Sequence, residues 1–111
     1  VKTLNGRCNM RKLAFKELKL SLPRDVIESI SNKEMITLLL GKALSKTEYY
    51  LSKCREFEEK YSINIQSFKE KIKKAEKEIF TEWDDLIVWE GYDLGYKEWK
   101  KKYEELRSCI E

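Results

Sequence analysis

Residues 17–22 alternate strictly between polar side chains and leucine, and the alternation stops at Pro23. A period of two places Leu18, Leu20 and Leu22 on one face of an extended chain and the polar residues on the other. The pattern therefore predicts a short β-strand that ends at the proline. Because a lone strand leaves its backbone groups unpaired, we expect it to pair with the same strand of a second copy and form an intermolecular ribbon.

Helical spacing follows the proline. Residues 24–30 predict a short helix with apolar side chains on one face. Ser31 and Glu34 then have the spacing of a capping box, which predicts the start of a longer helix. Its apolar positions step by four and three over about thirty residues without proline, or about 45 Å of helix. These positions are Ile36, Leu40, Ala43, Thr47, Tyr50, Cys54, Phe57 and Tyr61.

A turn is predicted at residues 62–64, where this stripe is interrupted. Asn64 can cap the next helix, and Ile63 can pack on Phe68 as a hydrophobic staple. We expect the third helix to bury one face. That face carries Phe68, Ile72, Ala75 and Ile79.

A final helix is predicted to follow, with Thr81 as its cap. Within it, Gly91 and Gly95 interrupt good helix formers and lie four residues apart on one face. They favour either the close approach of another backbone or a kink. The aromatic stripe of this helix consists of Trp89, Tyr92, Tyr96, Trp99, Tyr103, Leu106 and Ile110.

These patterns predict a mostly α fold with one short N-terminal strand followed by three to four helices, two of them long. A chain of 111 residues is large enough for one hydrophobic core. We divide it into a flexible basic arm (1–14), a dimerisation and candidate DNA-binding region (15–61) and a helical partner-binding region (62–111).

The composition argues against catalysis. The chain has no histidine, so the imidazole on which most acid–base and nucleophilic sites depend is missing. Cys8, Cys54 and Cys109 are odd in number and far apart, which argues against disulfides and a zinc site. The adjacent Asp84 and Asp85 would diverge on a helix rather than share a proton or a metal. We expect no catalytic residue, metal site or cofactor.

The hydropathy of the chain predicts a cytoplasmic protein without a membrane partner. No window approaches eighteen uninterrupted apolar residues, and the first residues lack the hydrophobic segment of a secretory signal.

Charge is distributed unevenly. Residues 1–33 carry eight Lys or Arg against three Asp or Glu, a net charge of +5, whereas residues 34–111 carry a net charge of −2. A basic ribbon is typical of a β-strand reader of the DNA major groove. The alternative is an ordinary strand with a solvated polar face. The candidate DNA-binding residues are Lys16, Glu17, Lys19, Ser21 and Arg24.

A second candidate surface lies between residues 82 and 93, where acidic residues surround aromatic and aliphatic ones without any Lys or Arg. Tryptophan and tyrosine are enriched in binding hot spots, and an acidic rim favours a basic protein partner. The alternative is that the aromatic stripe is core. The candidate partner-binding residues are Trp83, Asp84, Asp85, Leu86, Trp89, Glu90, Tyr92 and Asp93.

The order of the LKLSLP segment (18–23), a short helix and a capped long helix resembles the ribbon-helix-helix start of small prokaryotic antitoxins. Residues 57–68 and 82–90 are similar to one archaeal-type antitoxin group, in which a KYGM-S-x-x-x-F turn precedes an acidic W-D-D-x-x-x-W-E helix. The similarity covers residues 15–108, although the helix after Pro23 is shorter than is typical.

The resemblance implies a homodimeric antitoxin that neutralises a small, basic, ribonuclease-like toxin and represses its own operon by binding operator DNA. The alternative from the residues alone is a self-associating helical scaffold or coiled-coil adaptor with no nucleic-acid role.

Overall fold

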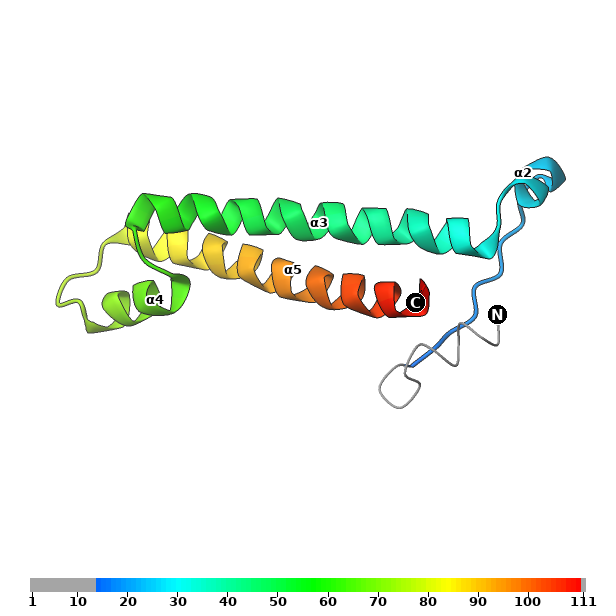
Figure 1. The fold of residues 1–111 in the computed structure, drawn as a ribbon. Coiled ribbons are helices and arrows are strands. Elements are labelled where there is room, and N and C mark those ends of the chain that lie inside the picture. Colours follow the sequence, from blue (N-terminus) through cyan, green and yellow to red (C-terminus); the bar gives the residue numbers. More distant parts are fainter. Residues whose placement is uncertain (1–13, 111) are drawn as a thin grey trace.

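Two long antiparallel helices lie side by side and form a hairpin within one chain (Figure 1). The structure is a computed structural model, and it describes residues 14–110. This part of the chain contains the helices α2 (Arg24–Ser29), α3 (Asn32–Tyr61), α4 (Ile65–Lys74) and α5 (Phe80–Ile110). The predicted mostly α fold with two long helices is therefore confirmed.

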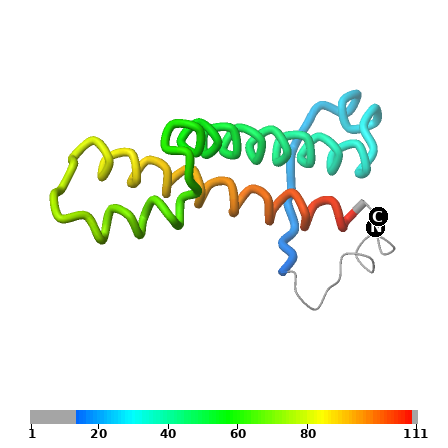
Figure 2. Tube along the Cα trace, turned by 60° about the vertical axis from the view of Figure 1, so that its left-hand side comes forward, coloured from blue at the N-terminus to red at the C-terminus, as the bar shows by residue number. Residues whose placement is uncertain are grey.

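The molecule is elongated, with extents of 63 × 32 × 21 Å. The short helix α4 and the loop that joins it to α5 lie at one end of the hairpin, whereas α2 lies at the other (Figure 2). α4 packs against α5. The hairpin therefore has a closed end, where α4 covers the long helices, and an open end, where the N-terminal segment enters.

The predicted strand is wrong for the single chain. Residues 14–23 have no regular secondary structure, and Leu18 and Leu20 are 77% and 56% exposed. A strand needs a neighbour with which it exchanges backbone hydrogen bonds, and the described part of this chain contains no strand that could pair with it. The predicted basic arm lies outside the described residues, except for its last residue.

The local signals in the sequence predicted both ends of α3 correctly. The Ser31 hydroxyl oxygen accepts a hydrogen bond from the backbone N–H of Glu34 at 3.1 Å, and the hydroxyl also lies 3.3 Å from the Glu34 carboxylate, to which it donates. The helix ends at Tyr61, where Ser62 adopts the left-handed conformation with φ of 58°. The predicted turn is closed by Asn64, whose side chain accepts from the N–H of Ser67 at 2.8 Å.

Two predictions fail between α4 and α5. The helix α4 ends at Lys74, and Ile79 is 50% exposed rather than buried. Residues 73–81 are all exposed, so a longer helix would bury nothing. Thr81 does not cap α5, because the N–H groups of Glu82 and Trp83 donate to the carbonyl of Ile79 at 3.0 and 3.1 Å.

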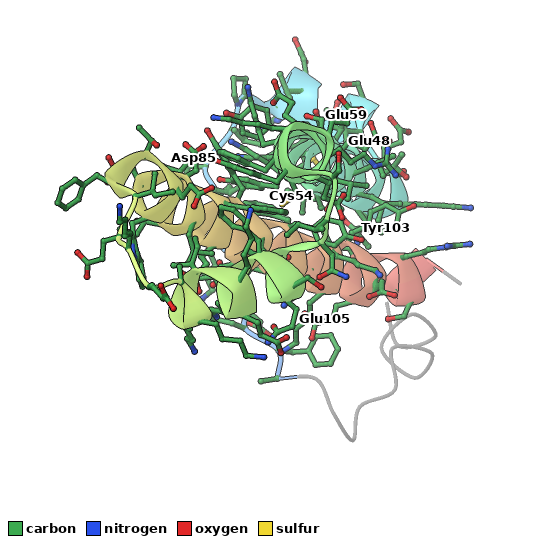
Figure 3. The ribbon with its side chains drawn as sticks, turned by 90° about the vertical axis from the view of Figure 1, so that its left-hand side faces the viewer. Glu48, Cys54, Glu59, Asp85, Tyr103 and Glu105 are labelled. Atoms are coloured by element: carbon green, nitrogen blue, oxygen red, sulfur yellow. The ribbon has the colours of Figure 1, made fainter. Side chains whose placement is uncertain are left out.

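The hydrophobic core sits at the closed end of the hairpin. Its buried members are Cys54, Phe68, Ile72, Leu86 and Trp89. Figure 3 views the molecule from this end, with Cys54 lying between α3 and α5. The rings of Phe57 and Trp89 stack with centroids 5.5 Å apart. All eight positions of the predicted α3 stripe are buried or half-buried, which confirms its orientation.

The two glycines of α5 have different surroundings. A Cβ atom added to Gly95 would lie 2.9 Å from two carbon atoms of the Tyr50 ring on α3, whereas one added to Gly91 would meet nothing within 4 Å. The predicted close approach is therefore made at Gly95, and by a side chain rather than by a backbone.

Candidate protein-binding surfaces

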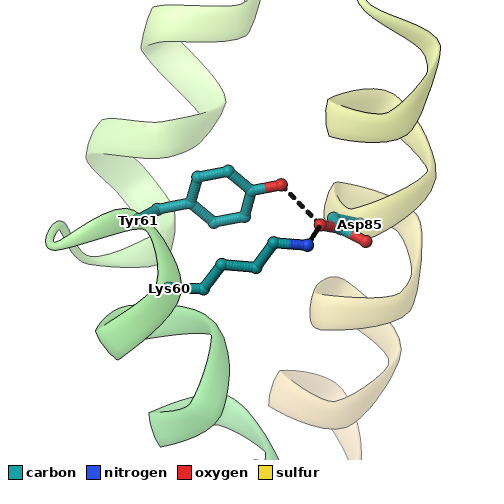
Figure 4. Close-up of polar contacts among 3 residues, drawn as sticks. All are labelled: Lys60, Tyr61 and Asp85. Atoms are coloured by element: carbon teal, nitrogen blue, oxygen red, sulfur yellow. Dashed lines mark hydrogen bonds and ion pairs between the residues drawn. The ribbon is translucent and has the colours of Figure 1, made fainter.

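The Asp85 carboxylate, which the sequence assigns to a partner-binding patch, joins the two long helices instead. The Lys60 ammonium group lies 2.7 Å from its Oδ2 atom, and the Tyr61 hydroxyl donates to the same oxygen (Figure 4). These hydrogen bonds, first from Lys60 and then from Tyr61, lower the pKa of Asp85 from its ordinary value of 3.8. Burial, followed by the hydrogen bond to Asp85, raises the pKa of Tyr61.

Two further carboxylates of the patch are engaged within the chain. Glu90 pairs with Lys69 of α4 at 2.8 Å, and Asp93 pairs with Lys97 one turn later at 2.9 Å. Asp84 differs, since it is exposed and forms no ion pair within residues 14–110. Asp85 and Glu90 thus fasten α5 to α3 and α4, whereas Asp93 pairs within α5 and Asp84 faces solvent.

The aromatic and aliphatic members of the patch belong mainly to the core. Trp89 and Leu86 are only 1% and 3% exposed. Trp83 and Tyr92 are half-buried and pack against the same cluster. The alternative interpretation, that these residues form core, therefore holds for Trp89 and Leu86.

The thiol of Cys54 is part of this core and is protonated at neutral pH. Burial, with a smaller contribution from the nearby Asp93 carboxylate, raises its pKa to about 11. A buried thiol with such a pKa is a poor nucleophile.

The candidate DNA-binding residues lie at the open end of the hairpin. Lys16, Glu17, Lys19 and Ser21 belong to the irregular segment, and Arg24 is the first residue of α2. All five are exposed, and none forms an ion pair with another described residue. Their side chains are accessible, but no sheet holds them in register.

Sequence reasoning missed most of a set of exposed apolar side chains at the same end, which belong to the irregular segment, to α2 and to α3. We call it the N-terminal apolar surface. It consists of Phe15, Leu18, Leu20, Leu22, Val26, Ile27, Leu38, Leu39 and Leu44, which are 39% to 77% exposed. The available signal was the pair Leu38 and Leu39, because Leu38 lies outside the stripe of α3 that faces α5.

A second apolar stripe was also missed, on the side of α5 that faces away from the core. We call it the outer stripe. Phe80, Ile87 and Leu94 are 77%, 65% and 59% exposed. Their spacing of seven residues, which is visible in the sequence, was the signal that could have revealed them.

The described residues contain no cluster of His, Cys, Asp and Glu side chains that could hold a metal ion. Among the same residues, no helix has the length and the apolar character needed to cross a membrane. Comparisons of the chain with protein-family models, curated proteins and solved structures found no match.

Proposed function

We propose that this chain is a non-enzymatic, antitoxin-like binding protein. It dimerises through the N-terminal apolar surface, contacts operator DNA through the neighbouring basic residues, and neutralises a small basic toxin through its helical region 62–111. The observation that carries the proposal is the N-terminal apolar surface, whose side chains remain 39% to 77% exposed in the single chain.

The size of this surface supports association with a second copy. Fully burying a large exposed apolar side chain contributes about 1.5–3 kcal/mol. Because these nine side chains are only 39% to 77% exposed, their further burial would supply at most on the order of 10 kcal/mol before the cost of association. Exposed apolar side chains gathered at one end of a molecule are typical of an interaction site. Pairing of residues 18–22 between two copies would also satisfy the backbone groups of this segment.

Dimerisation would bring two sets of basic side chains together. Lys16, Lys19 and Arg24 lie in or beside the apolar segment and are exposed. Two copies present twice this charge on one side of the dimer, which favours a polyanion such as DNA.

The carboxylates support a binding role rather than a catalytic one. Asp85, Glu90 and Asp93 are each paired with a lysine, so they are not arranged as facing acids that could share a proton. The chain also has no histidine.

The first test is the oligomeric state of the full chain by analytical ultracentrifugation. We expect a dimer that Leu38→Asp dissociates and that the control Ile87→Asp, on the other long helix, leaves intact. A wild-type chain that stays monomeric at high concentration would contradict the proposed dimer.

The second test addresses the toxin and DNA. The tagged chain should co-purify with a near-stoichiometric small basic protein, and adding the chain should inhibit RNA cleavage by that protein. DNA binding should weaken steeply with salt because lysines displace counterions from phosphates. Absence of the partner, or of DNA binding at low salt, would contradict the corresponding part of the proposal.

A second candidate function is a self-associating helical scaffold without a nucleic-acid role. It is favoured by Leu38, Leu39 and Leu44, since these exposed leucines place apolar side chains on α3, beyond the basic segment. It predicts that only the chain itself is recovered, as a homo-oligomer.

A further inference from the structure

The outer stripe of α5 is an apolar seam that the chain itself does not cover. Phe80, Ile87 and Leu94 are separated by seven residues each and therefore share one side of the helix. The buried residue Trp89 occupies the opposite side. The seam runs for about four helical turns, which is enough to receive another helix along its length.

The middle of the seam allows close approach. Gly91 lies one turn after Ile87 and one turn before Leu94, and it is exposed. Because a Cβ atom at this position would meet nothing within 4 Å, the space above Gly91 is open. A partner side chain can therefore reach the backbone of α5 there.

Two exposed carboxylates flank the seam. Of the five carboxylates in residues 80–96, Asp85, Glu90 and Asp93 are paired with lysines, whereas Asp84 is not. Asp84 lies one turn after Phe80, and Glu98 lies one turn after Leu94. Both are exposed and form no ion pair within the described part of the chain. Their charge attracts cations on a partner and repels carboxylates.

We propose that the outer stripe docks a basic amphipathic helix of a partner protein, with an apolar seam on Ile87 and Leu94 and with Lys or Arg beside Asp84 and Glu98. The inference rests on the proposed function in one respect, the binding of a protein partner. A second copy is a poor occupant, because two outer stripes packed together would place exposed carboxylates next to each other.

The experiment uses two synthetic helical peptides with leucines at heptad spacing, one flanked by Lys and Arg and its twin flanked by Glu. Binding to the full chain is followed by isothermal titration calorimetry. We expect the basic peptide to bind and the acidic twin to fail. Ile87→Asp and Gly91→Leu should weaken binding at least about tenfold, a loss of about 1.4 kcal/mol.

A matched control separates this inference from the proposed dimer. Leu38→Asp changes an apolar residue of similar exposure on α3 and should leave peptide binding unchanged. Circular dichroism checks that each variant keeps its helices. Unlike Ile87→Asp, Gly91→Leu adds no charge to the seam. The open space at Gly91 makes the leucine compatible with the fold.

Equal binding of both peptides, or failure of both, would overturn the inference. Unchanged binding after Ile87→Asp and Gly91→Leu would also overturn it. A change of oligomeric state in Ile87→Asp without peptide would assign the stripe to a second copy and would contradict the basic helix. In each of these cases, the proposed function would still be supported if the wild-type chain forms a dimer that Leu38→Asp dissociates.

Discussion

Replacing each glycine of α5 by alanine tests how closely the two long helices pack. Gly91 and Gly95 have the same chemistry and lie one turn apart in the same helix. Only Gly95 faces another element, since its added Cβ would lie 2.9 Å from the Cδ1 and Cε1 atoms of Tyr50. The pair therefore separates the intrinsic helix preference of alanine from the effect of packing against α3.

The expected magnitudes follow from these surroundings. Alanine is favoured over glycine inside a helix by about 1 kcal/mol, and Gly91→Ala should raise the free energy of unfolding by about this amount. At Gly95 the Tyr50 ring cannot move freely, because it packs against Tyr49 and Tyr92 with centroids 5.2 and 6.2 Å away. Such overpacking costs about 1–3 kcal/mol, so Gly95→Ala should be neutral or destabilise by up to about 2 kcal/mol.

Urea denaturation followed by circular dichroism measures both variants at one protein concentration, because association would shift the transition. Combining Gly95→Ala with Tyr50→Ala should relieve the clash, so that Gly95→Ala becomes stabilising in that background. If Gly95→Ala stabilised the otherwise unchanged chain as much as Gly91→Ala, α3 and α5 would not be in contact at this level, and the reasoning would be refuted.

Four further predictions concern the closed end. Tyr61→Phe should lower the free energy of unfolding at neutral pH by about 1 kcal/mol, by removing the hydrogen bond to Asp85. Because folding lowers the pKa of Asp85 from 3.8, this contribution is present above that pH and is lost as the pH falls through the folded-state pKa. If urea titrations of the wild-type chain and of Tyr61→Phe still differed in strong acid, this explanation would be contradicted. Trp89→Ala should cost about 3–5 kcal/mol, and an unshifted urea midpoint would show that this ring is not core. Ser62→Gly should raise the thermal midpoint, since glycine relieves up to about 1 kcal/mol at a left-handed residue, and a lower midpoint would count against the turn geometry. Iodoacetamide should label Cys54 only in unfolded protein, as judged by mass spectrometry, and rapid labelling of the native chain would contradict its burial.

Local signals in the sequence predicted α3 well. The cap at Ser31 and the apolar steps from Ile36 to Tyr61 depend on residues within a few positions of one another. The contacts behind these patterns join neighbouring turns of the same helix, so they do not depend on how the rest of the chain folds. The same holds for the cap at Asn64, which the structure confirms.

The failures concern features that depend on distant parts of the chain. Whether residues 18–22 form a strand depends on a partner strand, and the end of α4 depends on what surface lies beside residues 75–79. Neither surrounding is encoded in the local pattern. Periodicity alone therefore predicted a strand at residues 18–22 and a continued helix at residues 75–79. Both assignments were wrong in the single chain.

The candidate site shows the same limit. Asp85 and Lys60 are separated by 25 residues, and only the register of α3 against α5 brings them to 2.7 Å. The stripe of Trp89 has the spacing of both a core and an interface, so the sequence left both readings open. The outer stripe could have been found, because the spacing of Phe80, Ile87 and Leu94 is visible without a structure.

The hairpin also fixes how far apart bound molecules can be held. Its uninterrupted helix α3 has 30 residues, which corresponds to about 45 Å. This length is several times the Debye length of about 8 Å at physiological ionic strength, so charges at the two ends scarcely influence each other. Binding at one end should therefore leave affinity at the other unchanged, unless the helices slide. Molecules bound at the two ends would then be held at a constant separation, which the length of α3 sets.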